Sequence, residues 1–240
     1  TNAGVVAGIT AGTVTLTYTQ TSTGCSATKT ILVNSLPTLG GATSVCVGST
    51  ANVTPNSGGT WISSNTAIAT ITNAGLVTGI TAGTVTLTFT ETSTGCTNSK
   101  TLTVNALSIL GGASSVCIGS TANVTPNSGG TWTSNNTSIA TVTNAGVVTG
   151  IAAGTVTLTY TQTSTGCFAT KTFTINPLPV IGGATSVCRG STANVTPNTG
   201  GTWTTSNTAI ATITNAGLVT GITAGTVTLT FTQTSTSCVS

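Results

Sequence analysis

The chain has 240 residues, of which only 2% are charged, and four Lys or Arg side chains against one acidic side chain give it a formal net charge of +3, with no His. So little charge makes no basic patch for nucleic acid, and without His and with one carboxylate no acid–base pair, metal cluster or calcium site can be assembled. We therefore expect no enzyme, no cofactor, no metal and no nucleic-acid partner. We also expect no membrane insertion in this segment, because no apolar run approaches about 18 residues.

The chain begins with a motif that returns along its length. Thr1-Asn2-Ala3-Gly4 recurs at Thr72, Thr143 and Thr214, so the period is 71 residues. A unit of this length is large enough for a small domain. The period divides the chain into the C-terminal half of a repeat (1–35), two whole repeats (36–106 and 107–177) and a repeat lacking its last strand (178–240). We expect the chain to be a slice of a longer array.

Within one repeat the local signals are those of strands and turns. The expected strands cover residues 44–47, 50–54, 60–64, 67–71, 76–80, a long strand from 83, and 100–104. In the long strand Val85, Leu87 and Phe89 alternate with threonines, which is the pattern of a half-buried strand. Val14, Leu16 and Tyr18 are expected to be the buried half of the same strand in residues 1–35.

Seven short strands separated by frequent turns predict an all-β fold of tandem immunoglobulin-like sandwiches, with about seven strands per repeat. The third strand of each repeat carries a tryptophan, and Trp61, Trp132 and Trp203 are the candidate core residues. The links between repeats are short, and two of the three contain proline, which stiffens a linker. The sandwiches are therefore expected to form a linear rod.

The segment Thr60–Thr88 reads TWISSNTAIATITNAGLVTGITAGTVTLT and returns in every repeat. It resembles the group 2 bacterial immunoglobulin-like domain, whose hallmark is W-x-S-S-N-x-x-I-A-T-V, then G-x-V-T-G, then A-G-T-x-x-I. The resemblance implies a part in the stalk of a surface adhesin or invasin, in an S-layer-associated protein or in a secreted fibre. The additional V-C-V-G and T-G-C pieces are similar to repeats in giant secreted surface proteins of Bacteroidota.

The cysteines occur two to a repeat. They are Cys25, Cys46, Cys96, Cys117, Cys167, Cys188 and Cys238. Because the chain offers no His or Asp to complete a zinc or nucleophile site, all seven are expected in disulfides formed in an oxidising compartment.

Two pairings of these cysteines are open. Partners within a repeat would be Cys46–Cys96, Cys117–Cys167 and Cys188–Cys238. In an immunoglobulin-like sandwich, however, the two cysteines of one repeat lie at opposite ends. Pairing across the junction between repeats would instead give Cys46–Cys167 and Cys117–Cys238, provided that the Cα atoms come within about 7 Å.

The few charged side chains are not expected to carry chemistry. Lys29, Lys100 and Lys171 are expected to lie exposed near the start of the last strand, where they discourage edge pairing. Glu91 is replaced by glutamine in the other copies, so it is not a repeated functional position.

The threonine ladder has three interpretations. It is the solvent face of a strand, where the β-branch is favoured, or an uncharged face through which rods bundle, or a face that binds ice or glycan. We predict a structural stalk or filament segment of a bacterial adhesin fibre, secreted and at the cell surface. Its partners are the neighbouring repeats and like chains in a fibre. The alternative is a repeat binding module for glycan, ice or self-association.

Overall fold

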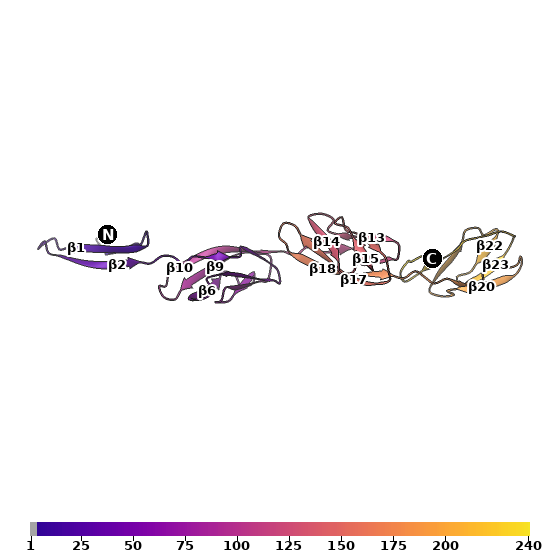
Figure 1. The fold of residues 1–240 in the computed structure, drawn as a ribbon, viewed down its shortest axis with the longest axis horizontal. Coiled ribbons are helices and arrows are strands. Elements are labelled where there is room, and N and C mark those ends of the chain that lie inside the picture. Colours follow the sequence, from indigo (N-terminus) through magenta and orange to yellow (C-terminus); the bar gives the residue numbers. More distant parts are fainter. Residues whose placement is uncertain (1–3) are drawn as a thin grey trace. The chain divides into compact units, whose positions relative to one another are not determined.

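The computed structural model describes residues 4–240, and every element in this part of the chain is a β-strand (Figure 1). The chain divides into two compact units, Thr1–Leu107 and Ser108–Ser240. The strands build tandem immunoglobulin-like sandwiches, which confirms the predicted all-β class.

The first unit contains a hairpin and a sandwich. In the hairpin, β1 (Gly12–Thr19) pairs antiparallel with β2 (Ser26–Val33). One sheet of the sandwich has the order β3 (Gly40–Gly41), β5 (Thr50–Thr54), β8 (Leu76–Gly79), β7 (Ala69–Ile71). The other has the order β4 (Ser44–Cys46), β10 (Thr97–Asn105), β9 (Gly83–Glu91), β6 (Gly59–Ser63).

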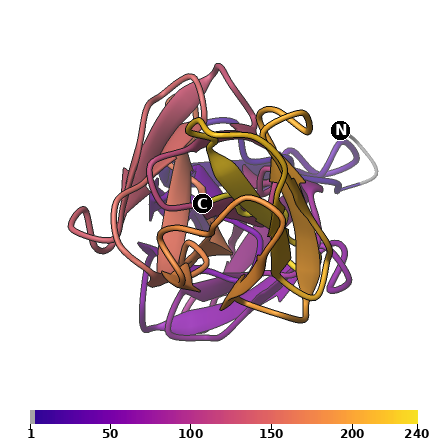
Figure 2. The ribbon, with the colours of Figure 1, turned by 90° about the vertical axis from the view of Figure 1, so that its right-hand side faces the viewer.

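The second unit contains two sandwiches. The sheets of the first are β11 (Gly111–Gly112), β13 (Thr121–Thr125), β16 (Val147–Gly150), β15 (Ala140–Val142), and β12 (Ser115–Cys117), β18 (Phe168–Asn176), β17 (Gly154–Gln162), β14 (Gly130–Ser134). The sheets of the second are β19 (Gly182–Gly183), β20 (Thr192–Thr196), β23 (Leu218–Gly221), β22 (Ala211–Ile213), and the pair β21 (Gly201–Thr205), β24 (Leu229–Gln233). Figure 2 shows the same ribbon turned by 90°, with the strands of this last sandwich in orange and yellow.

The first strand of each complete repeat is divided between the two sheets. β3 pairs antiparallel with β5, whereas β4 pairs parallel with β10. Gly41 sits at the bend with a φ of 78°, and a Cβ there would lie 2.5 Å from the Asn52 carbonyl oxygen. Only glycine fits this conformation and this approach of two backbones. The sequence predicted one strand over 44–47, and the two-residue strand before it is additional.

The core of each complete repeat lies between its two sheets. Val85, Leu87 and Phe89 are buried, as their alternation with threonine predicts, and Leu102 and Val104 of β10 are buried beside them. The core of the first sandwich has ten buried residues and that of the last has five. The last core is smaller because its second sheet contains two strands instead of four. Each buried aliphatic or aromatic side chain stabilises the fold by about 1.5–3 kcal/mol.

The hairpin differs from the prediction made for its apolar residues. Val14 is 41% exposed and Tyr18 is 73% exposed, although both were expected to be buried. Within residues 4–107, β1 pairs only with β2 in a two-stranded sheet. Burial of one face of a strand requires a second sheet, so the alternating pattern alone does not bury it.

Candidate functional site

Each predicted core tryptophan lies buried on the third strand of its repeat, against an aromatic ring of the long strand. The indole N–H of Trp132 donates to the carbonyl oxygen of Pro126 at 2.7 Å, and its ring centroid lies 5.1 Å from that of Tyr160. Trp61 and Trp203 make the same two contacts in their own repeats. The indole therefore satisfies its only polar atom while it fills the core.

A turn that recurs in each repeat holds the tryptophan strand through the asparagine of the T-N-A-G motif. Asn144 Oδ1 accepts a hydrogen bond from the backbone N–H of Trp132 at 3.1 Å. Thr143 Oγ1 accepts from the backbone N–H of Val147 at 3.2 Å. Asn73 and Asn215 repeat the contact of Asn144. Sequence reasoning used this motif only to find the period of the repeat, although an asparagine at the same place in each copy was the available signal for such a contact.

Two of the three lysines that were expected to lie exposed bond the opposite sheet instead. Lys100 Nζ donates to the carbonyl oxygens of Gly40 at 2.7 Å and Gly41 at 3.2 Å, so it joins β10 to β3 of the opposite sheet. Lys171 makes the same bonds to Gly111 and Gly112. Both side chains are half-buried, and the expectation that they lie exposed is wrong for them, because the long side chain reaches across to the other sheet. Lys29 is exposed, as expected.

In the loop after the long strand, hydrogen bonds to a threonine hydroxyl hold the backbone of the cysteine in place. Thr165 Oγ1 donates to Gln162 Oε1 at 2.6 Å and accepts from the backbone N–H of Cys167 at 3.2 Å. In the preceding repeat Glu91 takes the place of the glutamine and accepts from Thr94 Oγ1 at 2.6 Å. A carboxylate oxygen and an amide oxygen thus accept the same hydrogen bond in this loop. Glu91 therefore has the same structural role as the glutamine of the other repeats.

One disulfide connects the two sandwiches of the second unit. Cys117, at the end of β12, is bonded to Cys238 in the loop after β24, with a Cα–Cα distance of 5.6 Å and a sequence separation of 121 residues. This is the pairing across the junction between repeats. The alternative pairs within a repeat, Cys117–Cys167 and Cys188–Cys238, are not formed.

The remaining cysteines fall into two groups. Cys46 and Cys167 are disulfide-bonded. Cys25, Cys96 and Cys188 carry free thiols, which differs from the expectation that all seven are in disulfides. The partner of Cys46 stays a prediction.

The threonine ladder forms the outer face of the sheet that contains β9 and β10. Thr84 lies opposite Thr103, and Thr86 lies opposite Thr101, so the hydroxyl-bearing side chains stand in cross-strand pairs. All four residues are exposed. The face offers methyl groups and hydroxyls without charge, which suits solvent, a like face or a polyhydroxylated ligand.

Other kinds of site are not found in the described residues. Among residues 4–240 no group of three or more His, Cys, Asp or Glu side chains is placed to hold a metal ion. In the same residues no helix is long and apolar enough to cross a membrane.

The sequence matches one protein family along nearly its whole length. The family described as "Bacterial Ig-like domain (group 2)" matches residues 39–102, 96–175 and 168–239. The chain belongs to this family. The matched ranges of this bacterial Ig-like chain include the three tryptophans and six of the seven cysteines. No curated protein sequence matched it.

Solved structures with a similar fold include three bacterial surface proteins. Invasin, a bacterial integrin-binding protein, is 17% identical with a TM-score of 0.36, over 95% of this chain and 63% of its own. A 282-residue C-terminal fragment of intimin, solved with the intimin-binding domain of its translocated receptor, is 18% identical with a TM-score of 0.39, over 63% and 67%. Domains 4 and 5 of the S-layer protein SbsC are 22% identical with a TM-score of 0.24, over 52% and 82%. At these identities the likeness concerns the fold alone.

Proposed function

We propose that this bacterial Ig-like chain is a structural stalk or filament segment of a secreted bacterial surface protein, and that its repeats set length and carry load. The observation that supports this most is the Cys117–Cys238 bond, which ties one sandwich to the next. A bond between consecutive repeats adds nothing to a ligand site, but it resists separation of the repeats under tension.

The chemistry of the side chains supports the same role. The described residues bring no acid–base pair and no metal cluster together, and their buried polar side-chain atoms all have hydrogen-bond partners. Disulfides persist in oxidising compartments, which agrees with secretion to the cell surface. Adhesive specificity would then belong to another domain.

The proposed stalk has four parts: residues 1–35, 36–106, 107–177 and 178–240. Its partners are the neighbouring repeats of the same chain and, in a fibre, like chains. The short links and the disulfide limit how far consecutive repeats rotate, so the oxidised chain is expected to be a rod.

Small-angle X-ray scattering of the oxidised chain tests this proposal. A rod gives a cross-section of one sandwich and a maximum dimension several times larger, at every protein concentration. A compact particle with nearly equal dimensions would contradict it. Scattering after reduction is the comparison, because loss of the disulfide should broaden the distribution of long distances.

A binding module is the second candidate, and the exposed threonine pairs of β9 and β10 favour it. Glycan-array and ice-affinity assays of the whole chain discriminate between the two candidates. Binding that is lost when Thr86 and Thr101 are both replaced by Lys, with the scattering curve unchanged, would support the module. An inert chain in both assays supports the stalk.

A further inference from the structure

The tryptophan strand of each repeat lies at the free edge of its sheet. Among the described residues β6 pairs only with β9, β14 only with β17 and β21 only with β24. Each of these three strands is five residues long, whereas β3, β4 and β7, the other outer strands of a complete repeat, have two or three residues. An unpaired edge of this length is a template to which another strand can add.

Alternate residues of β14 direct their backbone groups away from β17. The N–H of Asn135, just after the strand, donates to the carbonyl oxygen of Thr157, so the odd-numbered residues face β17. The direction alternates along an antiparallel strand. The backbone groups that point outward are therefore those of Gly130, Trp132 and Ser134.

An asparagine side chain occupies the middle donor of this free row. Asn144 Oδ1 accepts the N–H of Trp132 at 3.1 Å, and Asn73 and Asn215 accept the tryptophan N–H at 3.1 Å in their own repeats. Asn144 lies in the turn that follows β15, so the bond also places this turn beside the edge of β14. A strand that approached the edge would find its central donor taken.

The usual protections of an edge are missing from these strands. Natural edge strands carry charged side chains, proline or a bulge, which keep other strands from pairing with them. β6, β14 and β21 read GTWIS, GTWTS and GTWTT, with no charge and no proline. Threonine, tryptophan and isoleucine favour strands, and two uncharged edges do not repel each other. The edge is therefore suited to pair with the same edge of a second copy.

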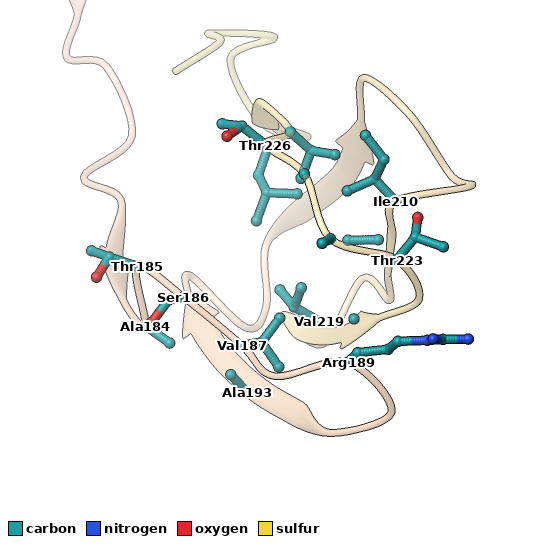
Figure 3. A pocket seen from close by; sticks show the side chains of 16 residues that line it. Ala184, Thr185, Ser186, Val187, Arg189, Ala193, Ile210, Val219, Thr223 and Thr226 are labelled. Carbon is teal, nitrogen blue, oxygen red and sulfur yellow. The ribbon is translucent and has the colours of Figure 1, made fainter.

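This edge is separate from the cavity of the last repeat. That cavity, of about 480 Å³, lies between the segment with Ala184–Val187 and the segment with Thr223 and Thr226 (Figure 3). None of its lining residues belongs to β21 or to the turn of Asn215. The partner that the edge fits is therefore an extended strand and not a small molecule in this cavity.

We propose that the asparagine of the T-N-A-G motif blocks the tryptophan-strand edge against antiparallel pairing with the same edge of a second copy of the chain. Without Asn144 the N–H of Trp132 is a free donor, and two copies can pair about a two-fold axis. Thr131 of one copy then lies opposite Thr133 of the other. This inference does not rest on the stalk proposal, because such a cap keeps like chains apart whatever the repeats do.

Sedimentation velocity of the full chain over a range of concentrations tests the proposal, with the disulfides intact and the free thiols alkylated. Asn144→Ala should form a dimer with an apparent Kd at least tenfold below that of any association of the wild-type chain. Asn144→Asp keeps an oxygen acceptor at the same place, so it should sediment like the wild type. An Asn144→Ala chain that associates no more than the wild type would overturn the proposal.

Two further variants separate edge pairing from association through unfolding. Val124→Ala removes methyl groups from the buried core of the same repeat and leaves the cap in place, so it should not associate more than the wild type. Thr131 and Thr133 are exposed, and their replacement by Lys in the Asn144→Ala chain sets like charges opposite each other across the paired edges. This triple variant should return to the wild-type sedimentation. Association of Val124→Ala to the same degree, or of the triple variant, would overturn the edge as the contact.

Hydrogen exchange measured by mass spectrometry locates the contact. In Asn144→Ala the peptide that contains Gly130–Ser134 should exchange more slowly as the protein concentration rises, because pairing covers its outward N–H groups. The corresponding peptide around β6, whose Asn73 is intact, is the internal control and should exchange at one rate at all concentrations. Slowing that is confined to peptides outside β14 would place the contact elsewhere and contradict the proposal.

Discussion

Single polar side chains fix each repeat at points where backbone pairing ends. Asn144 accepts from the backbone of Trp132, Lys171 holds two glycine carbonyls, and Thr165 orients the cysteine loop. Each of these side chains bonds backbone or a neighbour within its own repeat. They explain why a chain with so few charges keeps so many amides and hydroxyls at repeated positions.

Replacement of Asn144 by Ala should lower the free energy of unfolding of its repeat by about 1–2 kcal/mol, because the buried N–H of Trp132 loses its acceptor. Denaturant unfolding followed by tryptophan emission measures the change. Asn123→Ala, at an exposed strand position, is the control and should change stability by less than about 0.5 kcal/mol. Equal effects of the two substitutions would show that the bond does not stabilise the fold.

Ser237 occupies a position that glycine fills in the other copies of the loop. Its φ is 60°, and Gly166 has a φ of 71° at the same place. Because the left-handed conformation costs a residue with a Cβ about 1 kcal/mol, Ser237→Gly should raise the melting temperature of the last repeat in calorimetry. Ser237→Ala keeps the Cβ and should give no gain. A gain from both changes would point to the serine hydroxyl instead.

Lys171→Met should destabilise its repeat by about 1 kcal/mol, because two bonds from a charged donor are lost at a half-exposed site. Lys29→Met removes the same charge from an exposed strand and should have almost no effect. Thermal unfolding at low and high salt compares them. If both variants behave like the wild type, the lysine bridge contributes nothing to stability.

At the level of strands, local sequence patterns predicted most of the strands. They did not predict which strand faces are covered by a second sheet. Alternation placed Val85 and Leu87 inward because residues on one face of a strand repeat with a period of two. The strand Gly40–Gly41 has no side chains that alternate, so it was missed. The prediction that Tyr18 is buried was wrong, because no opposite sheet covers the hairpin in the described residues.

The candidate sites show the same limit. The tryptophans were predicted as core residues because each lies on the third expected strand of its repeat, where an immunoglobulin-like sandwich has a buried tryptophan, and all three are buried. The lysine bridge joins residues about 60 positions apart on opposite sheets, and nothing local in the sequence reports such a contact. The two cysteine pairings also look alike in sequence, since only the direction of the strands distinguishes them.

The Cys117–Cys238 bond should stabilise the second unit by about 2–5 kcal/mol, since it closes a loop of 121 residues in the unfolded chain. Cys117→Ser should therefore lower the denaturant midpoint, and Cys188→Ser, which removes a free exposed thiol, should not. Peptide mapping without reductant should recover the Cys117–Cys238 link. Recovery of a Cys117–Cys167 link would contradict the pairing.

At the level of the whole molecule, the disulfide between Cys117 and Cys238 gives a pulling force a covalent route that does not pass through the residues between them. Force applied at the two ends passes through Cys117 and Cys238, so the 121-residue span between them is protected from extension. A binding module would have no need of such a path. A stalk gains from it, because a repeat that unfolds between Cys117 and Cys238 does not lengthen the chain.

Single-molecule extension of the chain under oxidising and reducing conditions measures this protection. A 121-residue loop corresponds to about 400 Å of extended chain. Because reduction also opens the disulfides of Cys46 and Cys167, the oxidised chain should extend at least about 400 Å less than the reduced chain. The reduced chain should in addition unfold in repeat-sized steps. Equal final lengths before and after reduction would contradict a stalk whose consecutive repeats are stapled together.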